Sequence, residues 1–514
     1  MPQNQKKVFK NLLILALLLL SGCNNGTDSS ITNESSSEET PTSVDPKTLA
    51  TVRGKVLTDA GEMIAAGIIV ENAKGETYRT STNFQSAYNL RLEPGTYKFH
   101  FTRGFEYSTV TKTLTVEAYK TYYVQDVRLI QLEDSYAKGW IRGDTHQHTY
   151  YSDGINSVPD VLASNISNGL HYGFLTDHNT AWGLPEWVQG NRLPAQIDAE
   201  GNSHMFGAYE GMEVTTEFGH YQSYGLGLVF DLYEVSLRDI ERTKPQAEKD
   251  EIIKDRIRYI GDTIRWAGAV AQINHPYSTS TMGFRYWEDD VLSCFDTIEI
   301  WNGYFIPGDG RYEPEKEGYQ GQNYRSKVKW FEILNNVKNG GPYLAAVAGT
   351  DNHDVSGSYI PNPDIDLSTI EDLEDYNELF LKHGKYTGSP STVVKIDGKQ
   401  TDAKVMKALK DGNSFLTNGP MIYANINGKT YGEVVSLTTN SATLNLELFA
   451  RDGYEEVRII KNGEVIKTFA SNASERFTTN YTINNLENDD WLVLEVYGTG
   501  VQHAISNPIF ISIA

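Results

Sequence analysis

Short apolar runs alternate with segments of helical pattern between about residues 136 and 420, and this alternation is the strongest constraint on the fold. The runs end at Thr145, Asp177, Glu213, Leu228, Asn274, Trp301 and Asp351. Strands that alternate with helices form parallel α/β sheets, and about seven strands predict a closed barrel. Because the carboxyl ends of all strands lie at the same end of such a barrel, polar residues at these ends would lie close together.

Helix signals lie between the apolar runs. Ser157, followed by Pro159 and Asp160, predicts a helix start, and isoleucines at 253, 257, 260 and 264 form a helical stripe that ends at Ala267–Gly268. A further helix is expected over 401–410, before Gly412. Two connections, about 306–322 and 354–388, are long enough to be lids or binding loops, and disorder explains them equally well.

The first apolar run, Trp140–Gly143, leads directly into Asp144-Thr145-His146-Gln147-His148 and then Ser152-Asp153-Gly154. In a strand, residues i and i+2 point to the same face, so His146 and His148 would project together. Two neighbouring imidazoles at a strand end are the beginning of a metal site, although such a pair alone is weak evidence.

Later runs add partners of the same chemistry. Six imidazoles and three carboxylates are candidate ligands: His146, His148, Asp153, His178, Glu213, His220, His275, Asp351 and His353. Asp351 and His353 repeat the i, i+2 spacing of the first pair. These residues are enough for two or three divalent ions, and the mixture of nitrogen and oxygen donors suits zinc, manganese or iron better than magnesium or calcium.

The order of these motifs (HxH…SDG, TDH, Glu…His, NHP and DxH) resembles the PHP (polymerase and histidinol phosphatase) superfamily of metal-dependent hydrolases. The surrounding residues look most like its carbaryl-hydrolase-like (CehA/McbA) branch; they are Glu213-Val214-Thr215-Thr216, Gly219-His220, Glu299-Ile300-Trp301-Asn302-Gly303 and Thr417-Asn418-Gly419-Pro420. The resemblance covers about residues 136–420 and, more loosely, Ser506-Asn507-Pro508. It implies a distorted (β/α)7 barrel.

The resemblance also implies how the ligands are shared. His146, His148 and Asp351 would bind one ion, Glu213 would bridge to a second ion, and His220 and His275 would complete that second site. His178, His353 and Asp153 would hold a third ion. Asp153 departs from relatives that have a histidine near this position, so three ions are less secure than two. Glu213, Asp351 and His275 would be the catalytic ligands.

Other polar residues near the motifs have less specific interpretations. His171 and His204 match no motif and are expected to be core or surface histidines. Asp144 and Asp177 adjoin ligands but alternate away from them, so we expect them to orient the ligands. Glu217 is interpreted as a solvated loop charge, and Arg285 is a weakly supported anion contact. Three residues would either touch substrate or satisfy backbone groups: Asn274, Tyr277 and Asn302.

The chain has no GxSxG, HExxH or P-loop motif, so a covalent nucleophile is not expected. The expected function is therefore hydrolysis of an ester-type bond by a metal-bridged hydroxide. The bond is a phosphoester in most of the superfamily and a carbamate or carboxyl ester in the branch most resembled. The alternative is a surface glycan-binding lipoprotein with a vestigial metal site.

The N-terminus indicates export and a lipid anchor. Residues 1–22 resemble a bacterial lipoprotein signal, with an apolar run that ends in Leu20-Ser21-Gly22-Cys23. Cys23 would carry the lipid and attach the protein to a membrane of the cell envelope. Cys294 is the only other cysteine, so a lipidated chain has no intramolecular disulfide. The net charge of −22 argues against nucleic acid as a partner.

All-β patterns flank the α/β region. Residues 23–48 are polar and are expected to be a flexible linker. Residues 49–131, in which Tyr97, Phe99 and Phe101 alternate with polar residues, predict a β-sandwich similar to carboxypeptidase-regulatory domains. Residues 421–514, with a hairpin turn at Asn462-Gly463, predict a second β-sandwich.

Overall fold

The computed structural model describes residues 48–197, 203–231, 234–237, 240, 243–278, 282–303, 319–356, 386–471 and 474–514. The expected signal segment, Cys23 and nearly all of the linker lie outside these residues, and so does most of the two long loops. Among the described residues, no helix is both long and apolar enough to cross a membrane.

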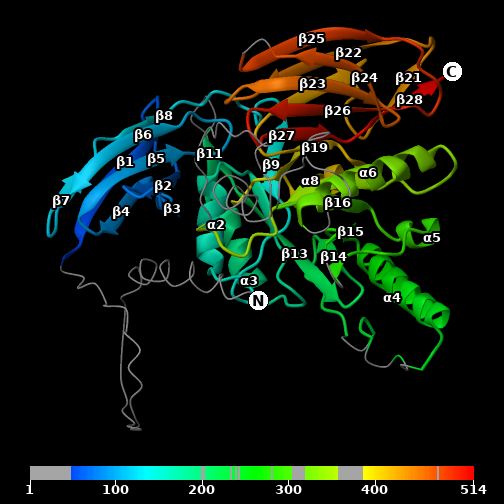
Figure 1. The fold of residues 1–514 in the computed structure, drawn as a ribbon, viewed down its shortest axis with the longest axis horizontal. Coiled ribbons are helices and arrows are strands. Elements are labelled where there is room, and N and C mark those ends of the chain that lie inside the picture. Colours follow the sequence, from blue (N-terminus) through cyan, green and yellow to red (C-terminus); the bar gives the residue numbers. More distant parts are fainter. Residues whose placement is uncertain are drawn as a thin grey trace.

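The N-terminal part folds into two small sheets that share one core (Figure 1). One sheet consists of β1 (Ala50–Thr58), β4 (Ala87–Leu92), β7 (Thr121–Tyr123) and β8 (Val127–Leu129). The other consists of β2 (Gly67–Asn72), β3 (Thr77–Ser81), β5 (Gly95–Thr102) and β6 (Val110–Val116). Phe99 and Phe101 of β5 are buried in the shared core, as their alternation predicts.

The central part belongs to the largest sheet, which has 15 strands in the described chain. Seven of its strands correspond to the seven predicted apolar runs. They are β9 (Trp140–Asp144), β10 (Tyr172–Leu175), β13 (Gly207–Thr216), β14 (Gly219–Tyr224), β15 (Val270–Ile273), β16 (Thr297–Asn302) and β17 (Ala345–Gly349). A separate hairpin joins β11 (Pro194–Ile197) and β12 (Ser203–Met205).

The expectation of a parallel α/β architecture is wrong at one of these seven strands. β9, β10 and β13 are parallel, and so are β15, β16 and β17, but β14 is antiparallel to both β13 and β15. The reason is local: only Glu217 and Phe218 separate β13 from β14. A connection this short makes a hairpin, whereas a parallel pair needs a crossover of a dozen or more residues.

The sheet curves until the end of its last central strand reaches the end of the first. Gln147 and Asn352 form a parallel bridge. The backbone N–H of His148 donates to the carbonyl of Asn352 (2.9 Å), and that of Asp351 donates to the carbonyl of His146 (2.8 Å). The segments that follow β9 and β17 therefore lie side by side at the carboxyl edge of the sheet.

Along the chain, helices alternate with the central strands (Figure 1). They are α2 (Val158–Ser167), α3 (Leu184–Trp187) with the 3₁₀ turn Val188–Arg192, α4 (Gln246–Trp266), α5 (Asp289–Leu292), α6 (Tyr319–Val337) and, after β18, α8 (Asp402–Asp411). α2 begins at the predicted helix start, where Ser157 is the N-cap and forms a capping box with Asp160. The isoleucine stripe of α4 is buried, and Gly412 ends α8 in the left-handed conformation at φ 73°.

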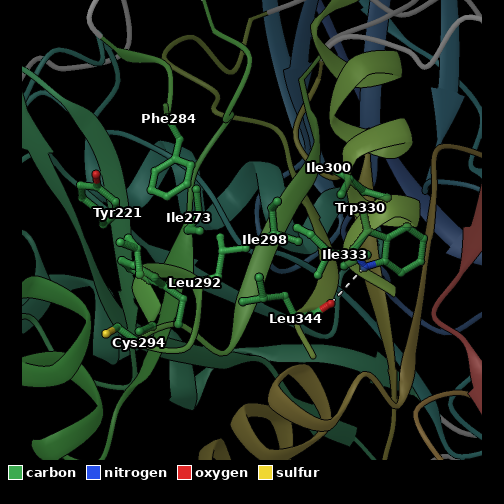
Figure 2. Close-up of a cluster of buried hydrophobic side chains, with 14 of the residues drawn as sticks. Tyr221, Ile273, Phe284, Leu292, Cys294, Ile298, Ile300, Trp330, Ile333 and Leu344 are labelled. Carbon is green, nitrogen blue, oxygen red and sulfur yellow. Dashed lines mark hydrogen bonds between the residues drawn. The ribbon is translucent and has the colours of Figure 1, made fainter. Parts of the chain in front are cut away.

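The main core lies between the central sheet and the helices α4, α5 and α6 (Figure 2). Trp330 of α6 is fully buried, and its indole Nε1–H donates to the carbonyl of Leu344 at 3.0 Å. Cys294 lies in the same cluster. The burial of these side chains anchors the helices behind the sheet and leaves its carboxyl edge to the polar residues.

The C-terminal part continues the large sheet across residue 420. The continuing strands are β18 (Ser391–Lys395), β19 (Ser414–Thr417), β23 (Tyr454–Lys461), β24 (Glu464–Ala470), β26 (Trp491–Gly498), β27 (His503–Ser506), β21 (Val434–Leu437) and β28 (Ile509–Ile513). A second sheet contains β20 (Met421–Ile426), β22 (Ala442–Phe449) and β25 (Arg476–Ile483). Their common core also includes Trp140 of β9 and Phe415 of β19, so the central and C-terminal parts pack as one body.

Candidate metal centre

The structure brings the nine candidate ligands together at the carboxyl edge of the central strands. His146 and His148 follow β9, His178 follows β10, Glu213 lies in β13, His220 in β14, His275 follows β15, and Asp351 and His353 follow β17. Asp153 lies in the turn after β9. In the described chain, three overlapping groups of these side chains have the spacing of metal ligands.

The inner group contains His146, His148, Glu213 and Asp351. The Nε2 atom of His146 is 3.2 Å from Glu213 Oε2 and 3.4 Å from Asp351 Oδ1. The Nε2 atom of His148 is 3.3 Å and 3.0 Å from the same two oxygens. Because both histidine side chains are fully buried, this group is closed to solvent on the side of β9.

Glu213 stands between two sets of imidazoles. Its Oε2 faces His146, His148 and the Nδ1 of His178, which is 3.0 Å away. Its Oε1 faces the Nδ1 of His220 at 3.0 Å and the Nε2 of His275 at 3.1 Å. A carboxylate with each oxygen turned to a different set of nitrogen donors has the arrangement of a bridging ligand.

The outer group is more open to solvent. His353 Nε2 is 3.1 Å from Asp153 Oδ1, and His178 Nε2 is 3.5 Å from Asp153 Oδ2. The side chain of Asp153 is 57% exposed and that of His353 is 34% exposed. His178 contacts both the outer group and Glu213, so it links the outer group to the inner one.

The electrostatics of the centre favour positive charge around Glu213. Burial alone would raise the pKa of this carboxyl, but the facing imidazoles of His146, His178 and His220 outweigh burial and hold that pKa well below its usual range. Burial lowers the pKa of His148 to about 3, so its ring is neutral at pH 7. A buried carboxylate beside a neutral imidazole is a donor set suited to a cation.

Unsatisfied atoms give the test of whether a metal fits. Within the described chain, the buried atoms His146 Nε2, His148 Nε2 and Glu213 Oε2 have no hydrogen-bond partner. Buried polar atoms are normally satisfied, and leaving one unpaired costs about 1–3 kcal/mol. The two imidazole nitrogens lie 3.2 Å and 3.3 Å from Glu213 Oε2, so the three atoms converge on one point. The residues therefore fit a divalent ion.

Backbone conformation at the centre is strained where the ligands turn inward. His275 has φ 22° and Asp351 has φ 49°, both in the left-handed region that side chains other than glycine rarely adopt. Residues held this way cost about 1–3 kcal/mol each and cluster at functional sites. Both lie just after strand ends, where the turn directs the side chain into the centre.

Asp144 and Asp177 hold the loops that carry the histidines. Asp144 accepts hydrogen bonds from the N–H (3.1 Å) and hydroxyl (2.6 Å) of Thr350 and from the N–H of His146 (3.3 Å). Asp177 accepts from the N–H of Thr149 at 2.7 Å and from the hydroxyl of Ser152 at 2.7 Å. Each carboxylate thus ties together segments that follow two different strands.

The three candidate substrate contacts lie in different surroundings. Asn274 is fully buried and donates through Nδ2 to Glu213 Oε1 at 2.9 Å. Asn302 is also buried and donates to Glu299 Oε2 at 3.1 Å. Tyr277 is half-buried, with its ring stacked on Trp287 at 5.6 Å between centroids. Of the three, Tyr277 alone presents surface to solvent, while the two asparagines contact carboxylates of the centre.

Glu299 lies in the centre, although the sequence does not single it out as a site residue. It is fully buried in β16 and contacts His146, His275 and Asn302. The signal was available in the sequence, because Glu299 is the one charged residue in the otherwise uncharged run Thr297–Asn302.

The remaining polar residues lie outside the centre. His171 is buried, and its Nδ1 accepts from the backbone N–H of Arg142 at 3.0 Å, as expected for a core histidine. The His204 ring packs on Tyr136 at 4.2 Å. Glu217 is exposed and accepts from the N–H of Leu237 at 3.3 Å, and Arg285 is exposed.

Comparison with known proteins finds similar structures at low identity. No protein-family model matches the chain, and no curated protein matches it. One similar structure is a two-domain protein from Bacteroides vulgatus ATCC 8482 that contains a predicted PHP-like metal-dependent phosphoesterase. The two sequences are 15% identical, the match covers 73% of this chain and 95% of that one, and the TM-score is 0.35.

Two further structures match the chain over a shorter stretch. A candidate metal-dependent phosphoesterase from Bifidobacterium adolescentis ATCC 15703 has 16% identity, coverage of 47% and 96%, and a TM-score of 0.25. An amidohydrolase from Chromobacterium violaceum has 15% identity, coverage of 41% and 87%, and a TM-score of 0.25.

Proposed function

We propose that the protein is a metal-dependent hydrolase that cleaves an ester-type bond at the carboxyl edge of its central sheet. One observation carries the proposal: five imidazoles approach the single buried carboxylate of Glu213 within 3.3 Å. Without a cation, His146 Nε2, His148 Nε2 and Glu213 Oε2 would stay buried without a hydrogen-bond partner, which is unfavourable.

Two or three divalent transition-metal ions (zinc, manganese or iron) would be held by the nine ligands. When bound, such ions activate water and polarise the ester oxygen. The protein itself positions the ligands and excludes solvent from part of the site. Glu213 keeps the two sets of imidazoles at a fixed separation, and the burial of His146 and His148 excludes solvent from one side. Cys294, a possible nucleophile, lies in the hydrophobic core.

The finer assignment follows from the sequence motifs. We propose that the seven central strands form a distorted PHP-type (β/α)7 barrel of the CehA/McbA-like branch, flanked by two β-sandwiches. The parallel bridge between Gln147 and Asn352, which follow β9 and β17, supports this arrangement. Both phosphoesters and carboxyl or carbamate esters are proposed substrates, and a panel that contains all three classes distinguishes them.

The difference in burial between the groups predicts two classes of bound ion. Ions held by the inner ligands are expected to survive dialysis against a mild chelator, because His146, His148 and Glu213 are inaccessible. An ion held by Asp153, which is 57% exposed, is expected to exchange readily. Metal analysis before and after dialysis measures this. Loss of all ions at one rate would contradict the prediction.

We also propose that the protein is a lipid-anchored lipoprotein of the cell envelope, on the basis of Leu20-Ser21-Gly22-Cys23 after a short apolar run. Cys23→Ala is expected to block lipidation and leave an unprocessed precursor that still carries residues 1–22. Mass spectrometry of the N-terminus measures the processing. A Cys23→Ala protein with normal mature mass and membrane partitioning would refute the anchor.

A further inference from the structure

Glu299 is a buried carboxylate surrounded by hydrogen-bond donors. It lies in β16, a strand whose residues are all buried, and its side chain is fully inaccessible. A charge buried in such a strand is costly unless it is fully hydrogen-bonded. Its oxygens accept from the His146 ring, the His275 backbone and the Asn302 amide. Two of these three donors belong to candidate metal ligands from different strands.

The first contact fixes the orientation of the His146 ring. Glu299 Oε1 lies 2.9 Å from His146 Nδ1. Because a carboxylate only accepts, the ring N–H that faces Glu299 is the one on Nδ1, and Nε2 is the atom left to face the inner group. That atom faces Glu213 Oε2 at 3.2 Å and Asp351 Oδ1 at 3.4 Å. Glu299 thereby turns the coordinating nitrogen toward the inner group.

The second contact holds the turn at His275. Glu299 Oε2 accepts the backbone N–H of His275 at 2.9 Å. This residue is in the left-handed region at φ 22°, so its backbone needs support from its surroundings. The same residue presents Nε2 to Glu213 Oε1 at 3.1 Å. One carboxylate therefore positions a ligand on each side of Glu213.

We propose that Glu299 is the positioning residue of the metal centre, which orients His146 through its ring and His275 through its backbone. The proposal rests on the proposed metal-dependent function and adds a specific requirement to it. Outer carboxylates that hydrogen-bond ligating histidines commonly contribute 10–100-fold in metal affinity. We expect an effect of this size from Glu299, with no direct contact between Glu299 and the ion.

Glu299→Gln is the test. All three neighbours are donors, and glutamine offers one acceptor oxygen and one NH₂ donor, so at least one neighbour must face another donor. Zinc affinity of metal-depleted protein, measured by competition with a chromogenic chelator, is expected to fall about 10–100-fold. Thermal unfolding of the metal-free protein is recorded beside it, to separate loss of ligand geometry from loss of stability.

Glu495→Gln is the matched control. Glu495 is also a buried carboxylate, and it contacts Lys327 at 2.7 Å and His503 at 3.2 Å, neither of which is a candidate ligand. This variant is expected to lose stability while its folded form keeps zinc affinity close to that of the wild type. An equal loss of affinity in both variants would show a general effect of destabilisation and would overturn the proposal.

Unchanged zinc affinity in Glu299→Gln would also overturn it. If that variant does not fold, Glu299→Asp is measured in the same way. Aspartate keeps two acceptor oxygens but is one methylene shorter, so it withdraws from His146 and His275, and wild-type affinity in this variant would refute the role of Glu299. A wild-type protein that binds neither zinc, manganese nor iron would instead refute the proposed function itself.

Discussion

Replacing Glu213 by glutamine is expected to lower ester hydrolysis by more than about 100-fold, beyond the range typical of residues that only orient ligands. The substitution keeps the size of the side chain but removes the negative charge that five imidazoles face at 3.0–3.3 Å. Two divalent ions held close together need this charge to offset their repulsion. The variant is therefore expected to bind fewer ions, as measured by metal analysis.

Glu217→Gln is the control for this experiment. Glu217 lies four residues further along, in the exposed turn between β13 and β14, and its carboxylate accepts from the N–H of Leu237. The control is expected to keep wild-type metal content and activity. A Glu213→Gln protein with near-wild-type turnover would exclude Glu213 as the bridging ligand.

A second large effect is expected on stability, from Lys327→Met. Lys327 of α6 is 3% exposed, and its Nζ is 2.7 Å from Glu495 Oε1 in β26. Burial would raise the pKa of Glu495, but Lys327 and His503 outweigh it and lower that pKa. Removal of Lys327 leaves a buried carboxylate without its cation, which typically costs about 3–5 kcal/mol.

Chemical denaturation of the metal-free variant measures this loss. The double variant Lys327→Met/Glu495→Met is expected to recover part of the stability, because it removes both buried charges. A loss below about 1 kcal/mol for the single variant, as for a surface pair, would show that this ion pair does not hold α6 against the C-terminal sheet.

Much of the fold follows from local patterns in the sequence. The seven apolar runs correspond to β9, β10 and β13 to β17, and the capping residues at Ser157 and Gly412 mark helix ends where predicted. These features depend on residues close together in the chain, which is why they are readable. The antiparallel direction of β14 was missed because β13 continues to Thr216, past the predicted end of its apolar run at Glu213, and so leaves only two residues before β14.

The sequence was enough to predict which residue types form the candidate site and that they lie near strand ends. The nine side chains lie within three overlapping groups or in contact with them. The role of Glu299 was not predicted, since its contacts with His146 and His275 join residues 153 and 24 positions away in sequence. The same holds for Asn274, whose amide contacts Glu213 rather than an open surface. Such long-range contacts depend on how the sheet curves.

The central claim is that bound divalent ions make this centre a hydrolase. The most direct measurement is hydrolysis of a panel of phosphoesters, carboxyl esters and carbamates by metal-depleted protein, before and after reloading with zinc, manganese or iron, with Glu213→Gln in parallel. We predict that the depleted protein is inactive, that reloading restores turnover of at least one class, and that Glu213→Gln stays inactive. Full activity in depleted protein, or a fully loaded protein inert toward the whole panel, would contradict the account.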